Sequence, residues 1–136
     1  MSPRWLAILL LLPATNSYSF QFPIEIFEYV DNARVTVFIN EGDIDNSVNW
    51  IPFKGAPPLT IEQVTGSIQK YIAGKAEYRN AKLEEIELRK IPHHEKQWHY
   101  MVKMKTTIND EPHNHYFVVL MNGKIISALI EPESIK

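Results

Sequence analysis

All five histidines of the chain lie between His93 and Phe117, in the segment HHEKQWHYMVKMKTTINDEPHNHYF. The imidazole side chain binds zinc and copper, and it also exchanges protons near neutral pH. The segment could therefore form a metal site or a proton-transfer site. A zinc site requires at least three side chains that converge on one point at about 2 Å. The secondary structure that carries the histidines decides whether they can converge.

The histidine segment alternates between apolar and polar residues, which predicts two β-strands. If the chain turns at residues 109–110 (Asn-Asp), His113 and His115 lie beside Thr106 and Met104. The other three histidines are then five or more residues further along the hairpin, on the order of 17 Å away at about 3.3 Å per residue. This register excludes a single site built from all five histidines.

A smaller metal site remains a candidate at one end of this hairpin. His113 and His115 share one face of their strand, about 7 Å apart, and with Glu111 they could hold a surface metal ion. The connection at His93 and His94 offers a second pair of imidazoles. A histidine-based metal-binding protein is therefore one functional hypothesis.

Motifs for other chemistry are missing from the sequence. It contains no Gly-rich phosphate loop, no dinucleotide-binding motif, no HExxH and no Gly-x-Ser-x-Gly. Glu85 and Glu87 share a strand face, as acid–base carboxylates do, but so do the carboxylates of an ordinary solvated face. No set of residues fills the roles of nucleophile and base, so the sequence predicts a protein that is not an enzyme and needs no cofactor.

The first 19 residues, MSPRWLAILLLLPATNSYS, have the three parts of a secretory signal peptide. Arg4 precedes an apolar run, Trp5 to Leu12, and small or polar residues follow. The apolar run is too short to span a bilayer, which takes about 20 residues. We therefore expect cleavage after a signal peptide of residues 1–19, leaving residues 20–136 periplasmic or secreted, with no membrane-spanning segment.

Composition limits the class of the expected domain. The chain has no cysteine, so it is not a disulfide scaffold and has no thiolate metal site, and an exported chain without cysteine suits a bacterial periplasm. Its formal net charge of −2 gives no support for binding nucleic acid. The expected mature length suits a single domain.

The N-terminal part of that domain is predicted to be a β-hairpin followed by a loop. Two apolar runs flank Asp31 and Asn32, and Val35, Val37 and Ile39 share one face of the second run. Residues 41–59 contain two glycines and three prolines, which predicts a long loop. The large apolar side chains of this loop, Trp50, Ile51 and Phe53, are expected to fill one edge of the core.

The clearest local signal is a helix. Thr60 and Gln63 form a capping box, and Gly74 suits the C-terminal end. The spacing of three and four residues predicts one apolar stripe. Gly66 costs about 1 kcal/mol relative to alanine within a helix, which we interpret as close packing on a sheet. The stripe consists of Ile61, Val64, Ile68, Tyr71 and Ile72.

Strands are predicted from there to the C-terminus. Residues 81–91 and 98–107 alternate, and the second run places His99 on the face turned to solvent. Asn122-Gly123 between apolar runs indicates a two-residue hairpin turn, which places Val119 opposite Ile126 and Phe117 opposite Ala128 in the core. The predicted fold class is α+β, with one helix packed on a curled antiparallel sheet and the order two strands, one helix, three strands.

The helix and meander from Thr60 to Glu131, ending VLMNGKIISALIEPE, resemble small exported PepSY-type domains and, more loosely, cystatin-like folds. The resemblance covers about half the chain and concerns the layout of elements. PepSY-type domains are associated with binding and inhibitory roles in bacterial envelopes, so the resemblance implies such a role. Cystatin-type inhibitors present a Gln-Val-x-Val-Gly loop, which this sequence lacks, so their protease-binding role is not implied.

The predicted strand after Asn114 is apolar on both faces. One helix covers only one face of a sheet, so the other face must meet the Trp50 loop, the N-terminal hairpin or a partner. Tyr116, Val118 and Leu120, together with Trp50, are therefore a candidate binding surface. The sequence favours an exported, non-catalytic binding or interaction module, whose partner is another envelope protein or a second copy.

Overall fold

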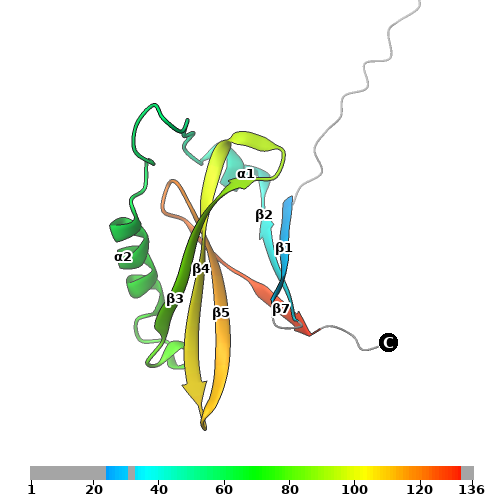
Figure 1. Ribbon diagram of the computed structural model, residues 1–136, viewed down its shortest axis with the longest axis vertical. Coiled ribbons are helices and arrows are strands. Elements are labelled where there is room, and N and C mark those ends of the chain that lie inside the picture. Colours follow the sequence, from blue (N-terminus) through cyan, green and yellow to red (C-terminus); the bar gives the residue numbers. More distant parts are fainter. Residues whose placement is uncertain (1–23, 31–32, 133–136) are drawn as a thin grey trace, which may run out of the picture.

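A computed structural model describes residues 24–30 and 33–132 (Figure 1). The predicted signal peptide at 1–19, its cleavage and the Asp31-Asn32 turn lie outside these residues. The elements are β1 (Ile24–Val30), β2 (Ala33–Ile39), α1 (Glu41–Asp45), α2 (Ile61–Ile72), the 3-10 helix η1 (Ala76–Tyr78), β3 (Lys82–Ile91), β4 (His94–Ile108), β5 (Glu111–Leu120), β6 (Ile125–Ser127) and β7 (Leu129–Pro132).

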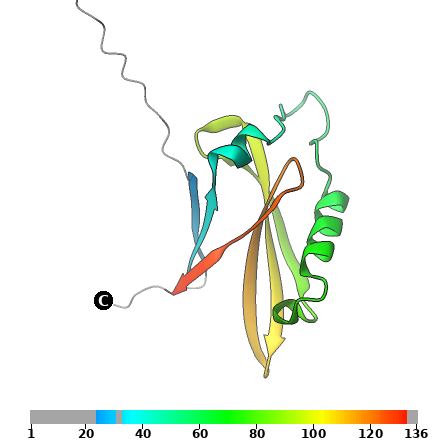
Figure 2. The same ribbon diagram turned by 180° about the vertical axis from the view of Figure 1, so that it is seen from behind.

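The described chain forms three layers: α2, a four-stranded sheet β3-β4-β5-β6, and a three-stranded sheet β1-β2-β7 (Figures 1 and 2). All strand pairs are antiparallel. The α+β class is confirmed, but the predicted order of two strands, one helix and three strands is incomplete. It lacks α1 and η1, it gives three strands after α2 where five follow, and it treats as one sheet what forms two. No helix among the described residues is long and apolar enough to cross a bilayer.

Helix α2 begins as the sequence predicts. The Thr60 hydroxyl accepts a hydrogen bond from the Gln63 amide at 3.2 Å, and the Gln63 side chain accepts one from the Thr60 amide at 2.9 Å. Val64 and Ile68 are buried against the four-stranded sheet, in a cluster with Phe117. Ile61, one residue into the helix, is exposed instead of joining the stripe.

Gly66 does not mark a close approach of α2 to the sheet, because a Cβ built there meets nothing within 4 Å. The substitution Gly66→Ala is therefore expected to raise the free energy of unfolding by about 0.5 to 1 kcal/mol, since alanine is the better helix former and adds no clash. Urea denaturation measures this as a higher midpoint with an unchanged slope. A lower midpoint would show that this face of the helix is packed.

The β4–β5 hairpin confirms the predicted register. Asn109 and Asp110 both have positive φ, 51° and 64°, as a two-residue hairpin turn requires. Thr106 pairs with His113 and Met104 pairs with His115. Pairing is continuous from Ile108–Glu111 at the turn to His99–Leu120 at the far end, so the histidines divide between opposite ends of the hairpin.

The loop of the last hairpin, which joins β5 to β6, is one residue longer than predicted. The Leu120 amide donates to the Lys124 carbonyl at 2.9 Å, so three residues form the loop instead of two. Gly123, with φ of 90°, provides the left-handed position that such loops use. Val119 consequently pairs with Ile125 and Phe117 with Ser127, so the predicted pairings with Ile126 and Ala128 are wrong. Phe117 and Val119 are nevertheless fully buried.

The chain changes sheets between β6 and β7. β6 pairs with β5, whereas β7 pairs with β2, where Thr36 lies opposite Leu129. Between them the Ala128 amide donates to the Tyr116 carbonyl at 2.9 Å. The C-terminal segment therefore joins the two sheets along one edge, as the orange-to-red ribbon in Figure 2 shows.

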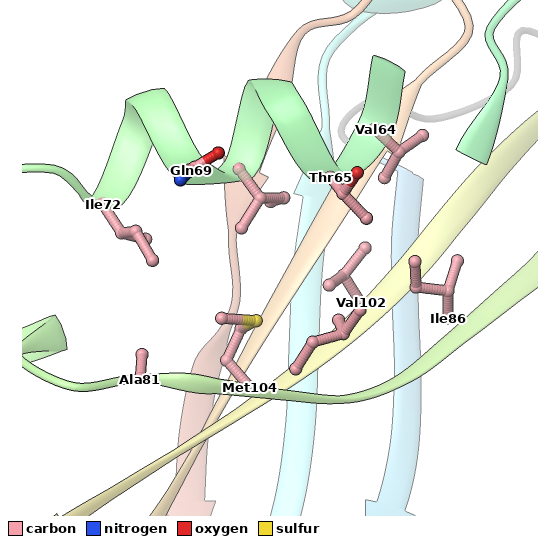
Figure 3. A pocket seen from close by; sticks show the side chains of 10 residues that line it. Val64, Thr65, Gln69, Ile72, Ala81, Ile86, Val102 and Met104 are labelled. Atoms are coloured by element: carbon pink, nitrogen blue, oxygen red, sulfur yellow. The ribbon is translucent and has the colours of Figure 1, made fainter. Parts of the chain in front are cut away.

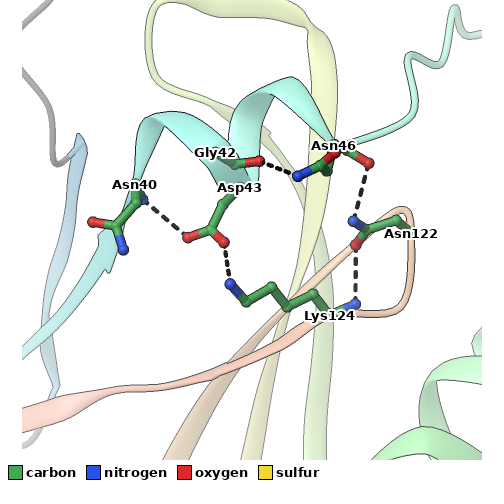
Figure 4. Close-up of polar contacts among 6 residues, drawn as sticks. All are labelled: Asn40, Gly42, Asp43, Asn46, Asn122 and Lys124. Carbon is green, nitrogen blue, oxygen red and sulfur yellow. Dashed lines mark hydrogen bonds and ion pairs between the residues drawn. The ribbon is translucent and has the colours of Figure 1, made fainter.

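A single helical turn, α1, replaces the start of the predicted loop. Asn40 and Asp43 form a capping box. The buried Asp43 carboxylate also forms an ion pair with Lys124, and the Asn122 side chain donates to the Asn46 carbonyl at 3.0 Å (Figure 4). Burial raises the pKa of Asp43, but the hydrogen bonds from Lys124 and Asn40 outweigh burial and lower it. These contacts fix α1 to the β5–β6 loop.

Candidate functional site

The first candidate site is the histidine pair of β5, His113 and His115. The side chain of His115 makes its contacts within the fold. The Nε2 atom of His115 lies 2.8 Å from the Thr106 hydroxyl, and its ring packs edge-on against Tyr78 with centroids 4.9 Å apart. Burial lowers the pKa of His115, the charge of His113 lowers it further, and Glu77 opposes both. His115 therefore favours the neutral form and supports the local packing.

The predicted metal site of Glu111, His113 and His115 is not formed. Across residues 24–30 and 33–132, no group of three or more His, Asp or Glu side chains is placed to hold a metal ion. Glu111 and His113 are exposed near the hairpin turn, whereas His115 is partly buried. The physical reason is that Thr106 and Tyr78 hold His115 toward the packed face of the hairpin.

His99 is buried, so the prediction that its side chain faces solvent is wrong. It is 1 % exposed, and neither ring nitrogen has a hydrogen-bond partner in the described part of the chain. It lies between Arg89 on β3 and Leu120 on β5. Burial lowers the pKa of His99 to about 4, with a further contribution from the charge of Arg89. His99 is therefore neutral at pH 7.

The predicted binding surface on β5 is also corrected. Tyr116, Val118 and Leu120 are buried, because the N-terminal hairpin covers this face. Of the three coverings considered from sequence, the N-terminal hairpin supplies most of the contact, and Ile44 of the segment that contains Trp50 adds to it. These residues build the core between the two sheets and are not accessible to a partner in this fold. The cluster also contains Ile26, Val35, Val37, Ile39, Ile44, Ile91 and Met101.

Trp50, the fourth residue of that predicted surface, anchors a loop. Its amide donates to the Lys96 carbonyl at 2.9 Å, and its indole Nε1 donates to the Gly55 carbonyl at 3.1 Å. Its ring packs edge-on against Trp98 with centroids 5.1 Å apart. Trp50 therefore holds the loop against β4, as an edge-filling residue does.

The other apolar residues of this loop do not fill the core. Ile51 is 46 % exposed and Phe53 is fully exposed. Phe53 also has φ of 70°, a left-handed conformation that costs a residue with a side chain about 1 to 2 kcal/mol. The prediction that they plug one edge of the core is wrong, because the loop turns outward at Ile51, whose carbonyl accepts from the Lys54 amide at 3.2 Å.

The second candidate site, a cleft between α2 and β3, was not predicted. α2 approaches β6 at the opposite edge of the sheet, so the side of the sheet toward β3 is only partly covered. Figure 3 shows side chains of the helix and of the sheet facing one another across this cleft. Its volume is about 260 Å³. We call it the α2–β3 groove; its lining is Val64, Thr65, Ile68, Gln69, Ile72, Ala81, Leu83, Ile86, Val102 and Met104.

The lining of the α2–β3 groove is mostly apolar. Eight of its lining residues are apolar, and the polar ones are uncharged. Leu83 is 47 % exposed at the start of β3. The groove contains no nucleophile paired with a base, so its geometry favours binding. The sequence signal for it was the apolar residues of β3, which the helix was expected to cover.

The edge of β3 beside this groove is poorly suited to strand addition. Its pairing with β4 is irregular at two places, between Leu83 and Glu85 and between Lys90 and Ile91. Its exposed side chains include charged ones of both signs, and an ion pair joins Glu87 and Arg89. Bulges and charges are the usual protection of an edge strand against pairing. A partner would therefore contact the groove through side chains.

No family model, no curated protein and no solved structure matches the chain.

Proposed function

We propose that this protein is an exported, non-catalytic binding module, and that the α2–β3 groove takes apolar side chains of another envelope protein. The observation that carries the proposal is an open, apolar groove that no described element covers. Leu83 is exposed at its rim, and Val64, Ile68, Val102 and Met104 form buried walls. Concave apolar surfaces of this kind commonly mark interaction sites. Export is proposed from the signal-peptide pattern at residues 1–19.

The size of the groove favours a protein partner over a small molecule. Its volume of about 260 Å³ lies below the roughly 300 to 1,000 Å³ of typical small-molecule sites. It is large enough for one or two large apolar side chains, and such anchors supply most of the binding energy of protein interfaces. Thr65 and Gln69 provide hydrogen-bonding groups in the lining.

Affinity capture from the envelope fraction, with the full chain as bait, tests this proposal. The variant Thr65→Trp places a large ring in the groove and is expected to lose the captured partner at least tenfold. Gly66→Ala is the matched control, since it changes the next residue of the same helix at a position open to solvent. We expect it to capture as much partner as the unmodified chain.

A second variant and a check of folding complete this test. Leu83→Arg places a charge at the groove without filling it, and it is expected to reduce capture as well. Circular dichroism checks that each variant is folded. Equal capture by all variants would contradict the proposal, and capture of a second copy, confirmed by sedimentation, would replace an envelope protein with self-association.

A further inference from the structure

We infer that the loop at residues 48–54 is a membrane-surface contact, with Phe53 and Ile51 entering the interfacial region of an anionic bilayer and Lys54 meeting its phosphate groups. The inference is independent of the α2–β3 groove. Phe53 is the residue of this loop whose exposed position the fold does not explain.

Phe53 contributes nothing to the stability of the described fold. Its side chain is fully exposed, so it buries no apolar surface, and its φ of 70° is one that glycine adopts without strain. A strained backbone position occupied by an exposed aromatic residue points to a role outside the fold. Such a role would be a contact of Phe53 with another molecule.

The loop presents Phe53 in a fixed geometry. Trp50 is held on both sides, by its backbone bond to Lys96 and by its indole bond to Gly55. The turn between Ile51 and Lys54 closes the tip. Because the loop is already ordered, binding costs little conformational entropy. Figures 1 and 2 both show the segment between α1 and α2 at the periphery of the molecule, beside α2.

The charge and composition of the loop match an anionic bilayer surface. From Asn46 to Ile61 the chain has no acidic residue and one cation, Lys54, although the whole chain has 16 Asp and Glu and a formal charge of −2. Asp45 and Glu95 line a recess beside Asn49, at the base of the loop. Aromatic side chains beside a lysine are typical of segments that lie at the boundary between headgroups and acyl chains.

The expected affinity is low, because few side chains enter the bilayer. A single myristoyl chain binds membranes with a constant on the order of 10⁴ M⁻¹, and this loop should bind no more tightly. The contact is therefore reversible, and it adds to binding through other sites on the protein by keeping the chain at the surface.

A fluorescent label on the loop tests the inference. The chain has no cysteine, so Ile51→Cys can be labelled at one position with an environment-sensitive nitrobenzoxadiazole dye. Ile108→Cys, at the turn of the β4–β5 hairpin, is the matched control, since Ile108 is exposed to a similar degree. We expect brighter, blue-shifted emission from the loop label with vesicles of phosphatidylcholine and phosphatidylglycerol, and no change from the control. The label reports on the loop alone, whether or not residues 1–19 are retained.

Two variants separate the contributions of insertion and charge. Phe53→Gly is expected to weaken the response about tenfold, from the loss of one large apolar side chain, while glycine preserves the loop conformation. Lys54→Glu is expected to weaken binding to the anionic vesicles about tenfold and to have little effect with phosphatidylcholine alone.

Several results would overturn the inference. The first is an emission from the loop label that no vesicle changes. The second is an equal emission change from the label at Ile108→Cys. The third is an emission change that Phe53→Gly leaves as it was. A response to detergent-extracted envelope proteins in the absence of vesicles would assign the loop to a protein partner instead.

Discussion

Replacement of Phe117 by alanine is expected to lower the free energy of unfolding by about 3 to 5 kcal/mol. Phe117 is fully buried on β5, and its ring packs against Tyr71 of α2 and Tyr78 of η1, with centroids 5.6 and 5.5 Å apart. The substitution removes these contacts and leaves a cavity between the helix and the sheet. For a domain of this size, such a loss is a large part of the total stability.

Phe53→Ala is the matched control for Phe117→Ala, because it makes the same chemical change at a fully exposed position. We expect it to change stability by no more than about 0.5 kcal/mol. Urea denaturation followed by circular dichroism measures both variants. Equal losses would contradict the packing of α2 on the four-stranded sheet.

Acidification is expected to destabilise the protein through His99. The folded pKa of about 4 lies below the ordinary value of 6.5, so the unfolded chain binds the proton more readily. Stability from this group is complete above pH 6.5, falls as the pH drops toward 4, and is lost below that. The difference corresponds to about 3 kcal/mol. The lowered pKa of His115 adds a contribution of the same sign.

The variant His99→Met tests this prediction with a side chain of similar volume. We expect the stability loss between pH 6.5 and 4 to shrink by most of those 3 kcal/mol, because the group that titrates is gone. We also expect higher stability at pH 7, by about 1 to 2 kcal/mol, since two unpartnered nitrogens leave the core. Leu120→Met is the control, because it places methionine at the buried residue that pairs with His99 and removes no titrating group, and it should keep the wild-type pH profile. Identical profiles for His99→Met and wild type would contradict the burial of His99.

The sequence predicted those elements whose signals are local. The capping box of Thr60 and Gln63 and the alternation of β4 and β5 act over a few residues, so α2 and the β4–β5 hairpin formed as expected. The register with His113 beside Thr106 followed from the position of one turn. Local hydrogen bonds and side-chain periodicity were sufficient there.

The second sheet could not be predicted, because it depends on pairing across the whole chain. β2 pairs with β7, which joins Thr36 to Leu129, and no local pattern specifies that contact. The N-terminal hairpin then covers a face of β4 that the alternation suggested was solvated. This one long-range arrangement explains both the burial of His99 and the loss of Tyr116 and its neighbours as a binding surface.

The α2–β3 groove escaped prediction for a different reason. Val64, Ile68 and Ile72 were assigned to the apolar stripe of a helix, and residues 81–91 and 98–107 to strands, but a groove is a gap between elements. The gap arises because α2 lies toward β6 and leaves Ile86 and Leu83 partly uncovered. The position of a helix across a sheet depends on the packing of all its neighbours. The resemblance to PepSY-type domains stays a prediction.

Site-specific photo-crosslinking in intact cells tests the proposed function most directly. A benzoylphenylalanine residue is placed at Leu83, in the α2–β3 groove, or at Leu129 on β7, which is 57 % exposed in the layer farthest from α2. We expect a discrete crosslinked product from position 83, its loss when Thr65→Trp is added, and none of that product from position 129. The same product from both positions, or none from position 83, would contradict a binding role for the groove.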